Sequence, residues 1–208
     1  METAKVKLDP KKTALITIDM INAMLDKNGR GGEWGLWKYC EEHEIGKKVA
    51  QALEICRKHD VFRVHVQHTL RPGAIGKPDV GIWKAFMELG CAEDGTWDQD
   101  FIAEAKPQLS PREIIVKKYR ASGFYHTDLD RILRNMGINS LIFCGCISCF
   151  CVNGTIMSAM DLDYLMTVLS DCVVSPNVEV TETLSKHIWP LLGCNVISVS
   201  HLEEALSG

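Results

Sequence analysis

The chain has 208 residues, of which 46% are hydrophobic and 24% charged, and its formal net charge is -4 at pH 7. This length supports one well-buried core, so we expect a single domain over residues 1–208. The charge balance gives no basic surface for nucleic acid, and no stretch approaches the roughly 18 apolar residues of a membrane span. We therefore exclude nucleic-acid and membrane partners. The N-terminal residues lack the apolar run of a signal peptide, which predicts a cytoplasmic protein.

Nine cysteines, an odd number, point either to a disulfide framework or to a metal site. In the cytoplasm thiols stay reduced, and a free cysteine packs like a small apolar side chain. We therefore expect most of the nine to fill the core.

Short β-branched runs alternate with longer stretches of helical spacing along the chain. Strands are predicted at residues 14–18, 61–66, 113–116, 140–145, 165–169 and 195–198. Helices are predicted at residues 45–59, 81–89, 127–135, 151–162 and 178–192. Parallel strands need crossover connections of this length. The pattern therefore predicts an α/β fold, a three-layer α/β/α sandwich with a six-stranded, mostly parallel sheet covered on both faces.

Two glycine- and tryptophan-containing stretches, residues 26–42 and 69–97, interrupt this alternation. Long irregular segments in compact domains are usually functional or disordered, and the tryptophans argue against disorder. We expect both stretches to lie over a site. Trp34, Trp37 and Trp83 either wall that site or pack in the core.

Polar side chains follow three of the predicted strands, at the edge of a parallel sheet where ligands bind. Asp19 follows the first strand and acts either as a helix cap or as a catalytic group. Lys117 and Lys118 follow the third strand, and strand alternation sends them to opposite faces. At most one of these lysines can therefore point into the site.

A cysteine-rich turn follows the fourth strand and ends at Cys151, where an amphipathic segment begins. A helix N-terminus lowers the pKa of a thiol and its N–H groups can hold an oxyanion, so Cys151 is the candidate nucleophile. The turn also suggests a metal or redox site, but only Cys146 and Cys149 have C-x-x-C spacing and no second pair exists. In a redox motif, moreover, the first cysteine begins the helix. The spacing therefore disfavours a metal site and a redox site alike.

Together these segments resemble the isochorismatase-like cysteine hydrolases, and the resemblance covers nearly the whole chain. This superfamily includes isochorismatases, nicotinamidases, and N-carbamoylsarcosine and ureidoacrylate amidohydrolases. The motif at Lys118 and the segment Gly95–Asp98 look closest to the ureido and carbamoyl enzymes. The residues that carry the resemblance are Leu15–Asn22, Lys118–Phe124, Thr127, Leu129, Gly145–Val152, Thr155, Ala159, Tyr164 and Ser170–Cys172.

The resemblance implies a triad in which Asp19 takes the thiol proton and Cys151 attacks a carbonyl carbon. Lys118 would position Asp19 and balance the charge. The backbone N–H groups of Ile147 and Cys151 would form the oxyanion hole, next to a cis peptide between Cys146 and Ile147. Water would then hydrolyse the acyl-enzyme.

The chain departs from the family pattern at several positions near these motifs. Ile21 stands where the family usually has glutamine, and Ile147-Ser148 replaces the usual Ala-Thr. Nicotinamidases bind a metal through an aspartate and a histidine after the second strand, and His68 and Leu70 stand at those positions here. We therefore expect no metal and no cofactor.

The expected substrate contacts come from the strand ends and from the two irregular stretches. Arg71 and Arg120 are candidates to neutralise a substrate carboxylate, although arginines at a surface usually bind water or an acid. The residues we expect to bind substrate are Asn22, Trp37, Gln67, His68, Arg71, Tyr119 and Ser148.

The resulting hypothesis is an amidohydrolase that cuts a C–N bond of a small ureido, carbamoyl or carboxamide compound through a thioester. One alternative is a vinyl-ether hydrolase, whose reaction needs no cysteine nucleophile. Another is a non-catalytic binding module on the same fold. The expected partners are a small-molecule substrate and further copies of the chain, in a dimer or tetramer.

Overall fold

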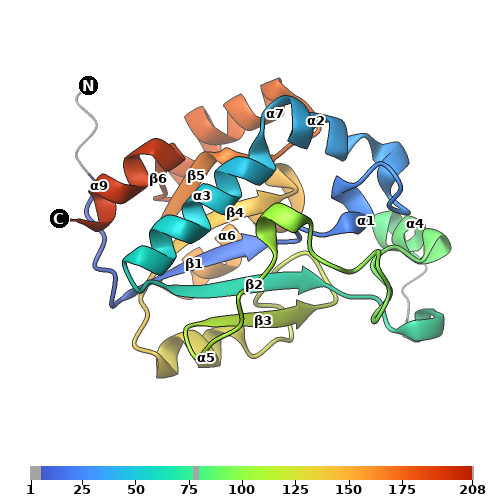
Figure 1. Ribbon diagram of the computed structural model, residues 1–208, viewed down its shortest axis with the longest axis horizontal. Coiled ribbons are helices and arrows are strands. Elements are labelled where there is room, and N and C mark those ends of the chain that lie inside the picture. Colours follow the sequence, from blue (N-terminus) through green and yellow to red (C-terminus); the bar gives the residue numbers. More distant parts are fainter. Residues whose placement is uncertain (1–5, 77–79, 208) are drawn as a thin grey trace.

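The computed structural model describes residues 6–76 and 80–207 and has three layers (Figure 1). Its middle layer is a six-stranded sheet in the order β3-β2-β1-β4-β5-β6. Every pairing in the sheet is parallel, so the predicted sandwich is confirmed and its sheet is parallel throughout. The strands are β1 (Thr13–Ile18), β2 (Phe62–His68), β3 (Glu113–Lys118), β4 (Ser140–Cys146), β5 (Leu165–Val174) and β6 (Asn195–Ile197).

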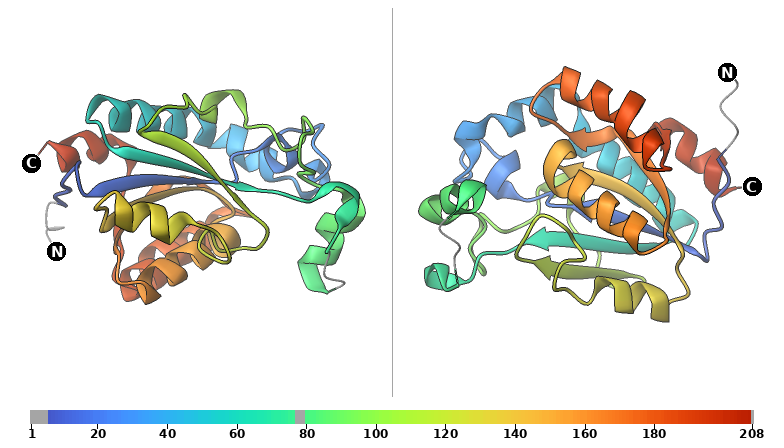
Figure 2. Two further views of the ribbon diagram at one scale, coloured as in Figure 1. Left: turned by 90° about the horizontal axis from the view of Figure 1, so that it is seen from below. Right: turned by 180° about the vertical axis from the view of Figure 1, so that it is seen from behind.

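Helices cover both faces of the sheet (Figures 1 and 2). The longer ones are α2 (Leu36–Glu42), α3 (Ile45–Lys58), α4 (Gly81–Leu89), α5 (Leu129–Asn135) and α6 (Asn153–Asp161). The shorter ones are α1 (Asn22–Leu25), α7 (Val178–Thr183), α8 (Trp189–Leu191) and α9 (Leu202–Leu206). Within the described ranges, none of them combines the length and the apolar character that a membrane crossing requires.

The alternation of β1 explains why the protein has two apolar cores. Leu15 packs into the core under α3 and α9, whereas Ile16 and Ile18 pack into the core under α5 and α6. Successive side chains of a strand point to opposite faces, so both sets of side chains of a central strand covered on both sides are buried. All six residues of β1 are accordingly buried.

Two predicted helices contain π-helical turns that the sequence pattern does not reveal. The helix predicted at residues 178–192 is interrupted by a π-helical turn, Leu184–Ile188, between α7 and α8. Pro190 lies just beyond this turn and has no N–H to continue a regular ladder. The helix predicted from Cys151 begins earlier, in a π-helical turn, Ser148–Val152, that leads into α6.

The two irregular stretches fold differently from each other. Residues 69–97 contain the short 3₁₀ helix Pro72–Ala74 and α4, and this part of the chain extends beyond the carboxyl end of β2 (Figure 2). Residues 26–42 contain the 3₁₀ helix Gly32–Trp34 and α2. Only the first stretch contributes to the cavity described below, so the expectation that both cover one site is half right.

A buried charge network at the start of β3 fixes how this strand pairs with β2. The Glu113 carboxylate binds Arg57 at 2.7 Å, Arg63 at 2.9 Å and His65 at 3.0 Å. Glu113 pairs with Arg63 in the register that places Lys118 opposite His68. A slip of one residue would turn Lys118 to the other face of the sheet, so this network also positions Lys118.

Replacing Glu113 by glutamine should destabilise the protein by about 3–5 kcal/mol at pH 7, because buried arginines lose their counter-charge. Burial works to raise the pKa of Glu113, but hydrogen bonds from His65, Arg57, the Gln108 N–H and Arg63 lower it. A lowered folded-state pKa stabilises the protein above the unfolded value and loses that effect as the pH falls.

The difference between wild type and Glu113→Gln should therefore shrink as the pH falls below the unfolded value of 4.5. Urea unfolding of both proteins, at pH 7 and in acid, measures it. A difference that is small at pH 7, or that does not change with pH, would contradict this account.

Candidate active site

Two of the three candidate catalytic residues, Asp19 and Cys151, follow the strands between which the strand order of the sheet reverses direction. The order runs outward from β1 to β3 on one side and from β4 to β6 on the other. In open parallel sheets the crevice between two such central strands, at their carboxyl ends, binds ligands. Asp19 follows β1 directly and Cys151 lies in the turn after β4. Lys118 is the last residue of β3.

Asp19, Lys118 and Cys151 form one buried polar cluster. The Lys118 ammonium lies 2.7 Å from Asp19 Oδ2 and donates a hydrogen bond to Cys151 Sγ at 3.4 Å. It also donates to the carbonyl oxygen of Arg120 at 3.0 Å. The side chains of Asp19 and Lys118 are both fully buried, so their attraction is little screened by water. The structure therefore brings together the three residues that the sequence selects.

Asp19 is held by the backbone on both sides. Its φ of 50° is left-handed, and its own N–H donates to the Val66 carbonyl at 2.9 Å. Its Oδ1 accepts the backbone N–H of His68 at 2.7 Å. The residue that precedes helix α1 is Ile21, so Asp19 does not cap this helix.

The two adjacent lysines separate as strand alternation predicts. Lys117 is exposed and pairs with Asp94 at 2.6 Å, whereas Lys118 is fully buried beside Asp19. Lys118 is therefore the lysine of the site.

Cys151 lies in the π-helical turn that follows β4. The Ile147 carbonyl accepts the N–H groups of Phe150 at 3.0 Å and of Val152 at 3.1 Å. The peptide between Cys146 and Ile147 is cis, as the resemblance implied. Cys149 is exposed while Cys151 is buried, so the two thiols point away from each other. The turn thus carries both residues of the expected oxyanion hole, Ile147 and Cys151.

The charge state of the thiol differs from the sequence-based expectation. Burial raises the pKa of Cys151 to about 12, with Lys118 lowering it and Asp19 raising it. For Lys118, burial opposes the charge, but the nearby Asp19 and Cys151 raise its pKa. A neutral thiol beside an Asp19–Lys118 ion pair has no net charge, whereas a thiolate would leave one negative charge in a buried cluster. The resting site therefore holds a protonated thiol. The lowering of the thiol pKa that we expected from a helix N-terminus is outweighed by the raising effect of burial.

Gly145 lets β4 pass close to β1 at the edge of the site. Its φ is 120°, and a Cβ there would lie 2.1 Å from the Ile18 carbonyl oxygen. Ile18 and Gly145 are the residues just before Asp19 and Cys146 in β1 and β4. A side chain at residue 145 would therefore push apart the two strand ends that carry Asp19 and the Cys151 turn.

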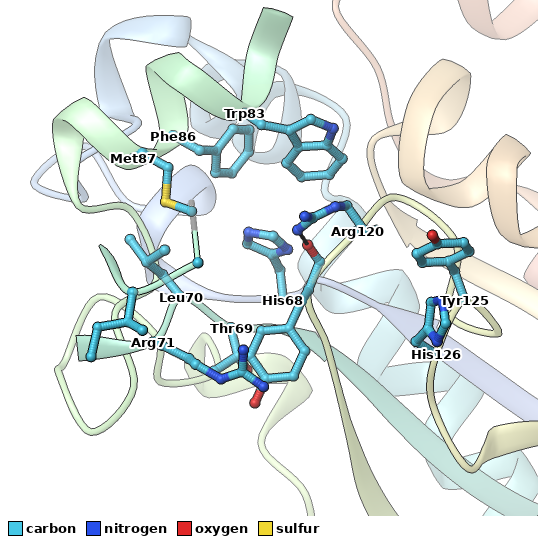
Figure 3. A pocket seen from close by; sticks show the side chains of 13 residues that line it. His68, Thr69, Leu70, Arg71, Trp83, Phe86, Met87, Arg120, Tyr125 and His126 are labelled. Carbon is cyan, nitrogen blue, oxygen red and sulfur yellow. Dashed lines mark hydrogen bonds between the residues drawn. The ribbon is translucent and has the colours of Figure 1, made fainter. Parts of the chain in front are cut away.

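A cavity of about 330 Å³ opens beside this cluster. Figure 3 shows the side chains that line it. Two of its lining residues touch the triad, since the His68 N–H binds Asp19 and the Arg120 carbonyl binds Lys118. Cys151 itself is not among the lining residues. The lining residues are His68, Thr69, Leu70, Arg71, Ile75, Gly76, Trp83, Phe86, Met87, Tyr119, Arg120, Tyr125 and His126.

The ring of His68 lies between the triad and the aromatic wall of the cavity. It stacks on Trp83 with ring centroids 5.7 Å apart and meets the edge of Phe86 at 5.1 Å. Burial, together with the charges of Lys118 and Arg120, holds the pKa of His68 well below its usual range. Its Nδ1 has no hydrogen-bond partner among residues 6–76 and 80–207. His68 is therefore an uncharged ring with an unused polar atom.

Of the expected substrate-binding residues, His68, Arg71 and Tyr119 line the cavity. The other four do not line it, and their polar atoms bind elsewhere. Asn22 donates to the Trp97 carbonyl, Trp37 to that of Gly32 and Gln67 to that of Gln99, while the hydroxyls of Ser148 and Ser175 bind each other.

The sequence interpretation did not single out seven of the lining residues, namely Thr69, Ile75, Gly76, Phe86, Met87, Tyr125 and His126. Tyr125 and His126 lie in the loop after β3, so their position beyond a strand end was a usable signal. Phe86 lies on α4, and nothing in the sequence shows which face of that helix turns toward β2.

A metal centre of the usual kind needs several convergent ligands. In the parts of the chain that the structure describes, no three His, Cys, Asp or Glu side chains are placed to hold a metal ion. Leu70, which stands where nicotinamidases have a histidine ligand, lines the cavity as an apolar residue.

The fold and the site define an α/β enzyme with a buried Cys, Asp and Lys cluster at the switch point of a parallel sheet. The isochorismatase domain model matches residues 13–200. A ureidoacrylate amidohydrolase from Caulobacter segnis is 30% identical over 179 residues, which cover 80% of this chain and 74% of that protein.

Two solved structures extend these similarities. An isochorismatase-like hydrolase from Alkaliphilus metalliredigens is 27% identical with a TM-score of 0.70, covering 93% of this chain and 98% of that one. An N-carbamoylsarcosine amidase from Thermoplasma acidophilum shares the fold with a TM-score of 0.72 at 24% identity, covering 90% and 96%. The protein belongs to the isochorismatase family and is a hydrolase.

Replacing Gly145 by alanine should destabilise the protein by at least about 3 kcal/mol, since it combines a left-handed backbone with a clash against the Ile18 backbone. Gly193→Ala is the matched control, because Gly193 also has a positive φ, 82°, but a Cβ there would meet no heavy atom within 4 Å. The control should lose only about 1–2 kcal/mol in urea unfolding. Equal losses in the two variants would show that the close approach of β4 to β1 does not matter.

Proposed function

We propose that the protein is a cysteine-dependent amidohydrolase that cuts a C–N bond of a small ureido, carbamoyl or carboxamide compound. The observation that carries the proposal is the contact of Lys118 with both Asp19, at 2.7 Å, and Cys151, at 3.4 Å, in a buried cluster. Such an arrangement of nucleophile, base and orienting cation fits covalent catalysis at a carbonyl. The adjacent cavity, about 330 Å³, is at the small end of ligand sites and suits a compact substrate.

In the first half of the reaction, Asp19 takes the proton of the Cys151 thiol as the sulfur attacks the substrate carbonyl carbon. Asp19 and Cys151 both lie against the Lys118 ammonium, at 2.7 and 3.4 Å, so the proton has a short path from the thiol to the carboxylate. Negative charge then moves from the carboxylate to the sulfur and on to the carbonyl oxygen. Lys118 contacts both Asp19 and Cys151, so its positive charge stabilises each stage.

The carbonyl oxygen becomes an oxyanion that we place against the backbone N–H groups of Ile147 and Cys151. When the tetrahedral intermediate collapses, the C–N bond breaks and the amine leaves with the proton that Asp19 holds. Asp19 then accepts a proton from a water molecule as the water oxygen attacks the thioester. When the C–S bond breaks, Asp19 returns this proton to the sulfur, and the acid and the free thiol are released. The N–H groups of Phe150 and Val152 donate to the Ile147 carbonyl, and these hydrogen bonds hold the turn that carries the oxyanion-binding N–H groups.

We also propose that His68 binds a polar group of the substrate. It lines the cavity, its backbone N–H holds Asp19, and its ring is uncharged. An uncharged imidazole can donate from one ring nitrogen and accept at the other, which suits the N–H and C=O groups of a ureido compound.

We propose further that the chain assembles into a dimer or tetramer. Apolar side chains are exposed on the segment that extends beyond β2, namely Ile75, Val80, Ile82 and Leu89. Exposed apolar groups concentrated on one projecting segment are typical of a contact surface. The mass in solution, by light scattering, tests this, and a monomeric mass would reject it. The cytoplasmic location stays a prediction from the sequence.

Replacing Cys151 by alanine should abolish ammonia release from ureido acids, carbamoyl amino acids and primary amides, because the proposed thioester forms on the sulfur of this residue. The matched control is Cys149→Ala, which removes an exposed thiol two residues away. The control should keep wild-type turnover. Turnover by Cys151→Ala, measured on a compound that wild type hydrolyses, would favour the vinyl-ether or another cysteine-independent mechanism.

Asp19→Asn should stop turnover and yet make Cys151 react faster with iodoacetamide near neutral pH. In wild type Lys118 lowers the pKa of the thiol, while Asp19 raises it by its charge and its hydrogen bond. Removing the carboxylate charge leaves Lys118 alone beside the sulfur, so the thiol pKa falls and the thiolate fraction at pH 7 rises.

Mass spectrometry of the Cys151 peptide measures this reaction in a Cys149→Ser background, which removes the exposed competitor. Slower alkylation of Cys151 in the aspartate variant than in wild type would contradict the proposed coupling of Asp19 with the thiol.

A further inference from the structure

The cavity wall is positively charged although the chain as a whole is negative. Among residues 6–76 and 80–207, its lining includes Arg71 and Arg120 but no aspartate or glutamate, in a chain with 27 acidic residues and a net charge of -4. Low-dielectric walls of one sign attract ligands of the opposite sign. The lining therefore favours an anion.

The two arginines rest on aromatic rings and not on acids. The Arg71 guanidinium lies 4.6 Å from the centroid of the Tyr119 ring, and that of Arg120 lies 5.7 Å from the Trp83 ring. Arg120 also donates to the Tyr119 carbonyl at 2.6 Å. In residues 6–76 and 80–207, no carboxylate oxygen lies within 4.0 Å of either guanidinium. These contacts hold the arginines but leave guanidinium N–H groups for a ligand.

The other charges near the cavity are already balanced. Lys118 is paired with Asp19, Lys117 with Asp94, and His68 is uncharged. The two arginines are thus the charges around the site that no acidic side chain of the described chain neutralises.

We propose that the cavity selects a small substrate bearing a carboxylate, which Arg71 and Arg120 neutralise while the amide carbonyl reaches Cys151. This inference rests on the proposed function and narrows it to anionic compounds. A guanidinium group forms two parallel hydrogen bonds to a carboxylate, which adds direction to the charge attraction. Trp83, Phe86 and Tyr119 supply flat walls beside it, so the cavity fits a planar or short acid better than a neutral amide of equal size.

The test is calorimetric binding to Cys151→Ala, which separates binding from turnover. The probes are malonamate, which has one carboxylate and one amide, its neutral diamide malonamide, and inorganic phosphate. Malonamate should bind at least about tenfold more tightly than malonamide, because hydrogen bonds to charged groups are the stronger ones. Phosphate should bind more weakly than malonamate, since the flat walls favour the planar acid.

Adding Arg71→Gln and Arg120→Gln together should remove the preference of the site for malonamate. Adding Arg131→Gln, which removes an equal charge from an exposed position on α5, should leave it unchanged. Arg71→Lys with Arg120→Lys keeps the charge and loses the planar fork, so it should retain only part of the preference. This second variant also serves if the double glutamine variant does not fold.

Equal binding of malonamate and malonamide, no measurable binding of malonamate, or a preference that survives loss of both arginines would each overturn the inference. Tighter binding of phosphate than of malonamate would overturn the assignment to a carboxylate. Selective binding of malonamate together with no hydrolysis of any amide by wild type would instead reject the proposed function and keep the inference. Hydrolysis of neutral amides without any preference for anions would reject the inference and keep the proposed function.

Discussion

The buried ion pair between Asp19 and Lys118 constrains the rest of the structure. Removing two charges from water is unfavourable unless each is well paired, and a misplaced partner leaves a charge uncompensated. Asp19 meets this requirement through Lys118 and through the His68 N–H, while Lys118 also donates to Cys151 and to the Arg120 carbonyl. Strands β1, β2 and β3 and the turn after β4 must therefore end at one point. The sheet order with β1 and β4 at its centre brings them there.

Much of this arrangement follows from short-range patterns in the sequence. The strands are found because each is a short apolar run, and alternation alone separates Lys117 from Lys118. Since the carboxyl ends of parallel strands share one edge, polar residues after three strands are expected near one site, and the family resemblance selects Asp19, Lys118 and Cys151 among them.

The parts that the sequence does not give depend on tertiary contacts. The protonation of Cys151 is set by its burial and by its distance from Asp19 and Lys118, and neither quantity is local. Gln67 and Trp37 are equally plausible cavity residues in the sequence, but each finds a backbone carbonyl partner elsewhere. Phe86 was missed because the side of α4 that faces β2 depends on how that helix docks.

The network at the other end of β3 shows that the site is also positioned from a distance. Glu113 binds Arg57 on helix α3 and Arg63 on strand β2, so it ties β3 to both. Because the strand is rigid and its side chains alternate, a contact at Glu113 determines which lysine enters the site five residues later.

The residues that react and the residues that select the substrate lie on different parts of the structure. Asp19 follows the fully buried strand β1, and the side chain of Lys118 at the end of β3 is itself fully buried, which suits chemistry that tolerates little displacement. Arg71 and Trp83 belong to the extended segment after β2, and changes there need not move the ion pair. His68 connects the two parts, because its backbone holds Asp19 while its ring packs against Trp83. Substrate choice can therefore vary along this segment while the reaction at Cys151 stays the same.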